Sequence, residues 1–150
     1  MGIEQEIGQA KFRNDYQKAV INLIYTFNWM NGKIKNMLDE YDITSQQFNI
    51  LRILRGAGTP ISTLQIRQRM LDKMSDTSRI VDRLIKKSMV QKVICAGDRR
   101  LVDVSITAEG TALLQRIDVL QDEMDSVFKN LSPEEAVTLN ELLDKIRNAE

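Results

Sequence analysis

The chain has 150 residues, of which 43% are hydrophobic and 28% charged, a composition typical of one folded domain rather than of a disordered chain. It contains no histidine and a single cysteine, Cys95, so an internal disulfide is excluded and the usual zinc ligand sets cannot form. The commonest general base is therefore missing, and the sequence has neither a Gly-rich phosphate loop nor a nucleophile elbow. We expect no enzymatic activity, no cofactor and no metal.

The N-terminal segment is polar, with Glu4 and Glu6 at positions where a signal peptide would carry an apolar run. No apolar stretch approaches the length of a transmembrane helix. We therefore expect a cytoplasmic protein without a membrane partner.

The overall net charge of zero hides a strong asymmetry along the chain. Residues 61–107 carry ten Lys/Arg against five Asp/Glu, a net charge of +5. Residues 108–150 carry a net charge of −6, and residues 1–60 a net charge of +1. A basic centre between a neutral and an acidic flank indicates that one segment meets a polyanion while the others have different roles.

The first predicted element is one long helix over residues 11–41. Its apolar side chains recur in alternating steps of four and three residues, the heptad-like pattern of a helix that packs along another helix. The pattern consists of Tyr16, Val20, Leu23, Phe27, Met30, Ile34, Met37 and Tyr41. Gly32 interrupts this helix and costs about 1 kcal/mol relative to alanine, which makes a bend possible there.

Two shorter helices follow, and each begins with a capping box, in which Ser or Thr is followed three residues later by Gln. The first is predicted over residues 44–55, from Thr44 to the glycine pair that ends it. The second is predicted over residues 62–71, beginning at Ser62.

Residues 72–74 form a predicted tight turn, after which Ser75 caps a helix that runs to about Lys87. At 100° per residue, one side of this helix is apolar and carries Thr77, Ile80, Val81, Leu84 and Ile85. The other side is polar and mostly basic, with Ser75, Asp76, Arg79, Asp82, Arg83, Lys86 and Lys87. Two helices joined by a tight turn, the second with a basic outer face, form the helix-turn-helix pattern.

A β-hairpin is predicted directly after the helix-turn-helix. Residues 90–94 read as one strand, and residues 102–106 alternate between apolar and polar side chains as a half-buried strand does. Ala96, Gly97 and Asp98 supply the turn between them. A hairpin in this position makes the segment a winged helix.

The C-terminal part is predicted to be two helices. Thr107 caps the first, whose apolar residues continue in heptad-like spacing from Leu113 to Leu131. Ser132 and Pro133 open the second with a capping box and a proline at the first helical position.

The segment from Ser75 to Gly110 resembles the MarR family of bacterial regulators. The likeness rests on the run from Thr77 to Leu84, on Lys87 and Val90, on Asp98-Arg99-Arg100, and on the run from Val104 to Gly110. The order of the elements resembles the family from about Lys11 to the C-terminus. Ser88 departs from the pattern, because family members usually have glycine there. A serine in the left-handed conformation costs free energy, so we expect some strain at this junction.

The resemblance implies a mainly α fold with a small β-hairpin wing. A winged helix-turn-helix lobe would span about residues 44–107, and dimerisation helices would span about 11–41 and 108–150, within a single domain over 1–150. It also implies a homodimer on a palindromic double-stranded DNA operator, with recognition helices in the major groove and wings in the minor groove. Release of the DNA by a small-molecule effector or a redox signal is a further implication, and a repressor is the expected outcome.

The candidate DNA-binding residues lie on the second helix of the helix-turn-helix and on the hairpin. They are Ser75, Asp76, Ser78, Arg79, Arg83, Lys86, Asp98, Arg99 and Arg100. Arg79 is the best candidate to read guanine, because its fork matches O6 and N7. The hydroxyls and N–H groups at the helix N-terminus suit a phosphate. Thr77 projects toward the core side, so its role could be structural.

Two residues of the hairpin have competing interpretations. Asp98 could orient Arg100, leaving Arg99 or Arg100 to enter the minor groove, or it could be an ordinary turn aspartate. Cys95 is predicted to serve packing rather than redox sensing, although Lys92, Arg99 and Arg100 could lower the pKa of its thiol.

Tyr25, Trp29 and Phe48 are candidates to line an effector pocket, with core packing as the simpler interpretation. Trp29 favours the pocket, because it lies off the main apolar stripe. The alternative to a DNA-binding regulator is a winged-helix protein-interaction module that has lost DNA binding. The four arginines at 79, 83, 99 and 100 argue against that alternative.

Overall fold

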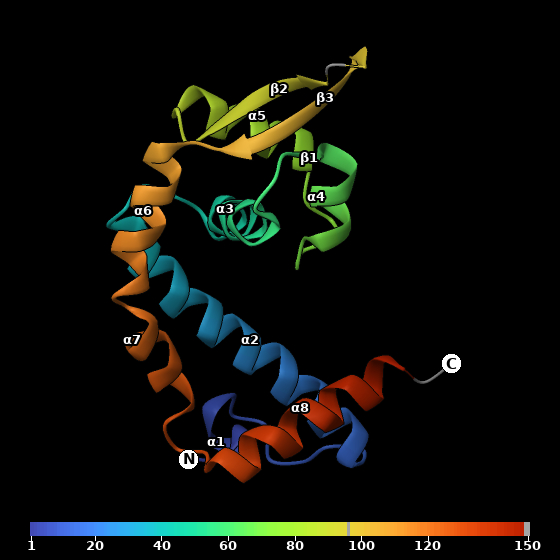
Figure 1. Cartoon of the computed structure of the whole chain (residues 1–150). Coiled ribbons are helices and arrows are strands. Elements are labelled where there is room, and N and C mark those ends of the chain that lie inside the picture. Colours follow the sequence, from blue (N-terminus) through green and yellow to red (C-terminus); the bar gives the residue numbers. More distant parts are fainter. Residues whose placement is uncertain (96, 149–150) are drawn as a thin grey trace. The chain divides into compact units, whose positions relative to one another are not determined.

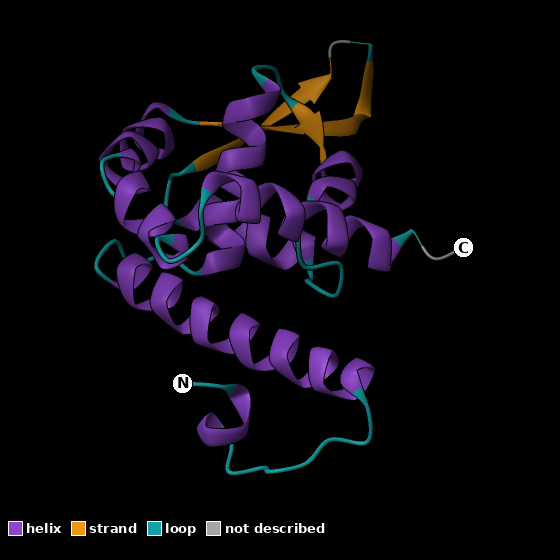
Figure 2. Cartoon of the chain, turned by 90° about the horizontal axis from the view of Figure 1, so that it is seen from below, coloured by secondary structure: helices purple, strands orange, loops and turns teal. Residues whose placement is uncertain are grey.

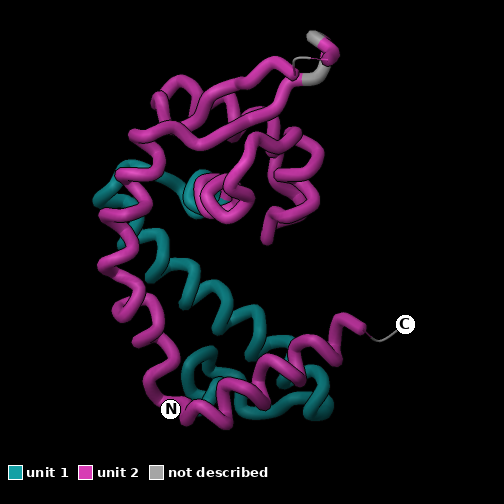
Figure 3. Tube along the Cα trace, viewed as in Figure 1, with its two compact units in different colours: residues 1–49 teal, residues 50–150 magenta. Residues whose placement is uncertain are grey.

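A computed structural model of the chain describes residues 1–95 and 97–148, without the side chains of Arg99 and Leu101. Ala96, predicted to be part of the hairpin turn, lies outside the described residues. The chain divides into two compact units, residues 1–49 and residues 50–150, which Figure 3 colours separately.

The first unit contains a short helix, α1 (Ile3–Glu6), and the long helix α2 (Asp15–Asp39). The sequence predicted a helix from residue 11, but α2 begins later because the Asn14 side chain accepts the N–H of Gln17 (2.9 Å) and fixes the cap there. The helix α1 was not predicted. An ion pair between Glu4 and Lys18 holds it to α2.

The helix α3 (Ser45–Ala57) crosses the boundary between the two units. Its predicted capping box is confirmed: Thr44 Oγ1 accepts the N–H of Gln47, and Gln47 Oε1 accepts the N–H of Thr44, both at 3.1 Å. Gly56 lies inside the helix rather than ending it. The chain turns instead at Gly58, whose φ of +67° is the left-handed conformation that glycine adopts at helix ends.

The second unit continues with a two-residue strand β1 (Ile61–Ser62), which was not predicted, and with α4 (Thr63–Arg69) and α5 (Thr77–Lys86). The capping box of α4 forms as predicted between Ser62 and Gln65. The cap of α5 is Asp76, one residue later than predicted, and its carboxylate accepts the N–H of Arg79 (3.2 Å). Helices lie beside the strands in Figure 2, and of these α4 contacts β1 and α5 contacts β2.

The hairpin consists of β2 (Val90–Cys95) and β3 (Asp98–Ile106), and β1 pairs with the other edge of β3. The antiparallel sheet therefore has the order β1-β3-β2 (Figure 1). The side chains of this unit that are at most 6% exposed come from α3, α4, α5, β1, β2, β3 and α6. They are Ile50, Leu51, Leu54, Ile61, Ile66, Thr77, Val81, Leu84, Val90, Val104, Leu113, Leu114 and Ile117, together with Met70, which directly follows α4.

The segment after the sheet differs from the single helix that its heptad spacing predicted. It is divided into α6 (Ala108–Asp118), α7 (Gln121–Asp125) and the short 3₁₀ helix η1 (Ser126–Phe128). The tighter hydrogen bond from Leu120 N–H to Ile117 O (2.9 Å) ends α6. The cap of α6 at Thr107 is confirmed. The last helix, α8 (Pro133–Arg147), begins with the predicted capping box at Ser132.

Candidate nucleic-acid interface

The helix α5 separates buried apolar residues from exposed polar residues, as the sequence predicted. Thr77, Val81 and Leu84 are at most 4% exposed. The side chains of Ser78, Arg79, Asp82, Arg83 and Lys86 are exposed. Since the apolar side is buried in the second unit, the basic side is the one that α5 presents to solvent.

Three basic side chains of α5 have no competing ion-pair partner within the described part of the chain. Arg79, Arg83 and Lys86 form no ion pair with any side chain that the structure describes. Asp82, in contrast, lies 3.6 Å from Lys92 Nζ on β2. The acidic charge on this face is therefore balanced by a lysine of the hairpin, and the arginines keep their donors for a ligand.

One of the predicted DNA-binding residues, Asp76, has a structural role at the start of α5. Asp76 caps the helix through Arg79 N–H. Ser75 is half-buried, and its Oγ has no hydrogen-bond partner among the described residues. Ser78 is exposed in the first turn, where the N–H groups have no acceptor within the helix.

Asp98 and Arg100 pair on the hairpin, which is one of the two geometries that the sequence allowed. Arg100 Nε lies 3.2 Å from Asp98 Oδ1 and Arg100 Nη2 lies 3.2 Å from Asp98 Oδ2. The Arg100 N–H also donates to Asp98 Oδ1 (3.0 Å). The Arg100 guanidinium, followed by its backbone N–H, lowers the pKa of the Asp98 carboxyl. The carboxylate is therefore ionised at neutral pH, and the pairing weakens only on acidification through that lowered pKa.

The base of the hairpin is fixed to α5 and α6 by a network around Ser88. Ser88 takes a φ of +61°, which confirms the predicted left-handed serine. Its N–H donates to Ile85 O (2.9 Å), and Met89 N–H donates to Leu84 O (3.0 Å), a Schellman arrangement. Thr107 Oγ1 then donates to Ser88 O (2.7 Å). This network determines the direction in which the hairpin leaves the recognition helix.

Cys95 has a different electrostatic environment from the one that its sequence neighbours suggested. Its Sγ lies 3.4 Å from Asp103 Oδ2 on the neighbouring strand. The pKa of the Cys95 thiol is raised, chiefly by the hydrogen bond to Asp103 and secondly by burial. The proposed lowering by basic neighbours is wrong, and the thiol is kept protonated at neutral pH.

We expect the Cys95 thiol to react slowly with iodoacetamide at neutral pH and to accelerate only above the ordinary thiol pKa, because the thiolate is the nucleophile. Asp103→Asn should shift the rate–pH profile to lower pH, since it removes the carboxylate. The profile is measured by mass spectrometry of the modified protein, with Asp122→Asn as the control for loss of a distant charge. A wild-type profile below the ordinary thiol range would contradict this environment.

Of the three candidate effector residues, Tyr25 and Trp29 lie on α2 and Phe48 lies on α3. Tyr25 Oη donates to Glu6 Oε2 (2.9 Å), and Lys33 Nζ lies 4.8 Å from the centroid of the Trp29 ring. Tyr25 and Trp29 are 37% and 46% exposed, whereas Phe48 is half-buried. The core interpretation therefore does not hold for the two residues of α2.

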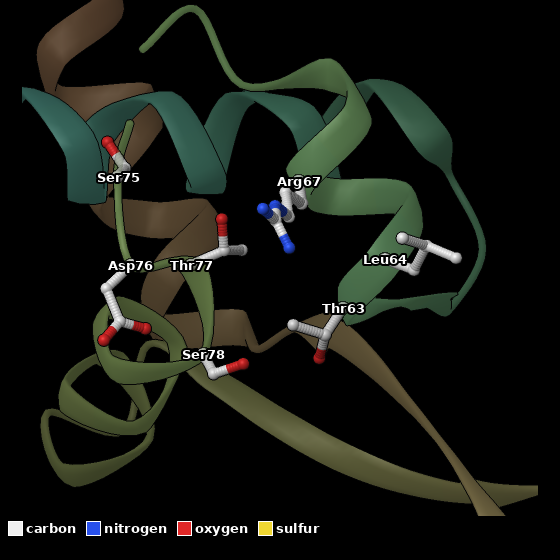
Figure 4. A pocket seen from close by; sticks show the side chains of 7 residues that line it. All are labelled: Thr63, Leu64, Arg67, Ser75, Asp76, Thr77 and Ser78. Carbon is white, nitrogen blue, oxygen red and sulfur yellow. The ribbon is translucent and has the colours of Figure 1, made fainter. Parts of the chain in front are cut away.

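Sequence reasoning missed Arg67 and Thr63 on α4, which line a cavity together with the start of α5 (Figure 4). The sequence could have indicated Arg67, because it is a basic residue on the first helix of the helix-turn-helix.

Among the described residues, no group of His, Cys, Asp and Glu could hold a metal ion. No helix within the described part of the chain is long and apolar enough to cross a membrane.

Comparison with known proteins places this geometry among DNA-binding regulators. The family model for the MarR family matches residues 43–102. The multiple antibiotic resistance protein MarR of Escherichia coli is 30% identical over 142 residues, which covers 91% of this chain and 98% of that protein.

Two solved structures extend the comparison. A cysteine-to-serine variant of E. coli MarR, complexed with operator DNA, has a TM-score of 0.69 at 27% identity and covers 85% of this chain and 95% of that one. BpsR of Bordetella bronchiseptica, whose DNA binding is regulated by 6-hydroxynicotinic acid, has a TM-score of 0.76 over 85% of this chain and 91% of that one. Because BpsR is 23% identical, its likeness concerns the fold alone.

Proposed function

The chain belongs to the MarR family, and we propose that it is a transcriptional regulator that binds double-stranded DNA in a sequence-specific manner as a homodimer. The observation that carries the proposal is the exposed side of α5, where Arg79, Arg83 and Lys86 have no ion-pair partner among the described side chains. A relative of the same family has been solved on operator DNA. The relatives are transcription regulators rather than enzymes.

Within this proposal, α5 lies in the major groove and the hairpin reaches the flanking minor groove. The contacting residues are Ser75, Asp76, Ser78, Arg79, Arg83, Lys86, Asp98, Arg99 and Arg100. Arg79 reads a base edge, and Lys86 neutralises a phosphate. The side chain of Arg99 lies outside the described structure, so its place in the minor groove rests on its position beside Arg100.

The apolar side chains that remain exposed on α2 and α8 support a homodimer. On α2, Tyr16, Val20 and Phe27 are 84%, 56% and 58% exposed. On α8, Val137, Leu142 and Ile146 are 54–59% exposed. Apolar faces of this kind are typical of a surface that another chain covers. We place the dimer contacts on these two helices.

An effector that releases the DNA is part of the same proposal. Tyr25 and Trp29 offer a half-exposed aromatic surface with a hydroxyl, and the third candidate, the half-buried Phe48, lies on α3. This surface suits a small aromatic compound. The regulation of BpsR by 6-hydroxynicotinic acid is a precedent on the same fold.

Selection of duplexes from a random DNA pool with the full-length protein tests the function. We expect a two-fold symmetric site whose half-sites are about 10 bp apart, because each chain has one recognition helix. Binding at full affinity to a single half-site would contradict the dimer. Recovery of no duplex would favour the alternative, a protein-interaction module.

The pairing of Asp98 with Arg100 predicts how the affinity for DNA changes when Asp98 is replaced, and the direction of that change tests whether Asp98 orients Arg100. Asp98→Ala removes a negative charge from a surface that faces DNA, so charge alone predicts tighter binding. We expect weaker binding instead, because Arg100 loses the carboxylate that orients it. Binding to the selected duplex is measured at one fixed salt concentration. Glu109→Ala, which removes a charge from α6, is the matched control, and tighter binding by Asp98→Ala would show that the aspartate does not orient Arg100.

A further inference from the structure

The short helix α1 is attached to α2 by two pairs of side chains, and Figure 1 shows the two helices beside each other. Glu4 forms an ion pair with Lys18. Two residues further along α1, Glu6 Oε2 accepts a hydrogen bond from the Tyr25 hydroxyl (2.9 Å). In both pairs a carboxylate of α1 meets a donor of α2. This side of α2 therefore already binds carboxylates, and its own chain supplies them.

The side of α2 that α1 covers differs from the apolar side assigned to the dimer. At 100° per residue, Lys18 and Tyr25 lie almost opposite Tyr16 and Phe27 around the helix. Trp29 follows Tyr25 by one turn and lies on the same side as Tyr25. A second chain on the apolar side of α2 therefore does not compete with α1 for its position.

The attachment of α1 is weak enough to be exchanged for another ligand. The helix has four residues, of which Ile3 alone is buried, and a helix of this length is not stable by itself in water. The side chains of Glu4 and Lys18 are 36% and 38% exposed, and an exposed ion pair contributes little. The hydrogen bond to Glu6 raises the pKa of the Tyr25 hydroxyl. The hydroxyl therefore keeps its proton at neutral pH and can donate to a different acceptor once Glu6 leaves.

We propose that α1 is an internal competitor of the effector: Glu6 occupies the Tyr25 hydroxyl in the ligand-free protein, and an effector with an ionised acidic group displaces Glu6 and releases α1. Trp29 provides the adjacent apolar surface for the body of such a ligand. The ion pair of Glu4 acts indirectly, because it holds α1 in the docked position and so lowers the fraction of protein that is ready to bind. The competition rests on the effector site proposed at Tyr25 and Trp29.

Hydrogen exchange measures the attachment of α1 in the full-length protein without DNA. The N–H groups of Glu6 and Ile7 donate to carbonyls at the start of α1, so their exchange reports its opening. We expect Glu4→Gln to accelerate this exchange about two- to fivefold, the effect of losing one exposed ion pair. Glu40→Gln, which removes a carboxylate at the other end of α2, is the matched control and should leave the exchange unchanged.

The competition is tested with sodium benzoate as the probe, because it carries a carboxylate on a flat apolar ring. Binding to the full-length protein is followed by the fluorescence of Trp29, the single tryptophan of the chain. We expect Glu6→Gln to bind benzoate about fivefold more tightly than the wild type, since a neutral amide is the weaker acceptor for the Tyr25 hydroxyl. Tyr25→Phe should bind benzoate about tenfold more weakly, because the donor is lost. Glu40→Gln should match the wild type.

Release of α1 is tested by combining the two measurements. Saturating benzoate should accelerate the exchange of the Glu6 and Ile7 amides in the wild type. Benzamide at the same concentration should not, because this neutral compound of the same shape is a poorer competitor for a carboxylate site. Benzoate that binds without accelerating the exchange would show that α1 is not displaced. Equal benzoate affinities of Glu6→Gln and the wild type, or no binding by either, would refute the competition.

These outcomes are separate from the fate of the proposed function, because neither measurement contains DNA. A protein that selects a duplex while Glu6→Gln leaves the benzoate affinity unchanged keeps its function, and α1 is then no competitor. If benzoate displaces α1 but leaves the affinity for the selected duplex unchanged, the competition holds and release of DNA through this site is wrong. A protein that selects no duplex loses the proposed function, and the exchange and benzoate measurements still decide whether α1 competes with an acidic ligand.

Discussion

Replacement of Gly110 by alanine is expected to destabilise the folded protein by about 1–3 kcal/mol, even though alanine is the better helix former by about 1 kcal/mol. A Cβ at this position would lie 2.3 Å from Met89 O and 2.8 Å from Ile106 Cγ1. Met89 O is backbone and already accepts the N–H of Thr107 (3.0 Å), so it cannot move away without breaking that hydrogen bond. The close approach of α6 to the base of the hairpin is possible only for glycine.

Urea denaturation at matched protein concentration measures this effect, because the stability of a dimer depends on concentration. Gly56→Ala is the matched control. Gly56 also lies in a helix, and an added Cβ there would meet nothing within 4 Å. It should stabilise the protein by about 0.4–1 kcal/mol, through helix propensity and the unfolded chain. The two substitutions should therefore have opposite signs, and equal signs would refute the steric argument.

Loss of Gly110 should also weaken DNA binding. The crowded atom belongs to Met89, which directly follows the left-handed Ser88 at the junction between α5 and β2. A shift of α6 would strain the hydrogen bond from Thr107 Oγ1 to Ser88 O. Both the recognition helix and the hairpin depend on this junction for their relative orientation within the second unit.

The elements that the sequence predicted well are those with strong local signals. Thr44, Ser62, Thr107 and Ser132 all cap helices as expected, because a cap requires only a side chain and an N–H group three residues away. At α5 two capping residues are adjacent, and local reasoning chose Ser75. The structure uses the Asp76 carboxylate, and the buried Ser75 hydroxyl has no hydrogen-bond partner among the residues that the structure describes.

The elements that the sequence missed depend on contacts between distant residues. The helix α1 has four residues and is tied to α2 through Glu4 and Lys18. At the end of α6, Asp118 forms a two-point ion pair with Arg55 of α3, 63 residues earlier (2.8 and 3.1 Å). No periodicity within residues 107–131 indicates that pairing or the end of α6.

In the candidate site, too, the sequence predicted the features that depend on local geometry and missed those that depend on contacts between distant residues. Projection at 100° per residue identified the exposed side of α5, because a helix face depends only on local geometry. The environment of Cys95 could not be obtained in this way. The register of the hairpin shifts between Ile94 and Cys95, and the thiol lies beside Asp103 of the neighbouring strand, a contact that the order of residues along β2 does not reveal.

Arg79→Ala is expected to weaken binding to the selected duplex by about 1–3 kcal/mol, roughly tenfold to 150-fold, and to relax the preference at one base pair. Arg79 lies in the first turn of α5, where a recognition helix contacts base edges. Its backbone N–H is held by Asp76, so the position of the residue is fixed while its exposed guanidinium remains available. Bidentate contact with guanine O6 and N7 requires a backbone that is fixed in position and a guanidinium whose N–H donors can reach the base.

Charge and geometry at this position can be separated by comparing three variants against duplexes that differ at single base pairs, all at one salt concentration. Arg79→Lys keeps the charge but loses the planar fork, so it should lose base discrimination nearly as completely as Arg79→Ala while retaining more total affinity. Lys86→Ala should weaken all duplexes about equally, because a phosphate contact carries no sequence information. If Arg79→Ala instead lowers affinity uniformly and leaves the selected sequence unchanged, Arg79 is a phosphate contact. Base reading must then come from another exposed side chain of α5, and Arg83 is the next candidate.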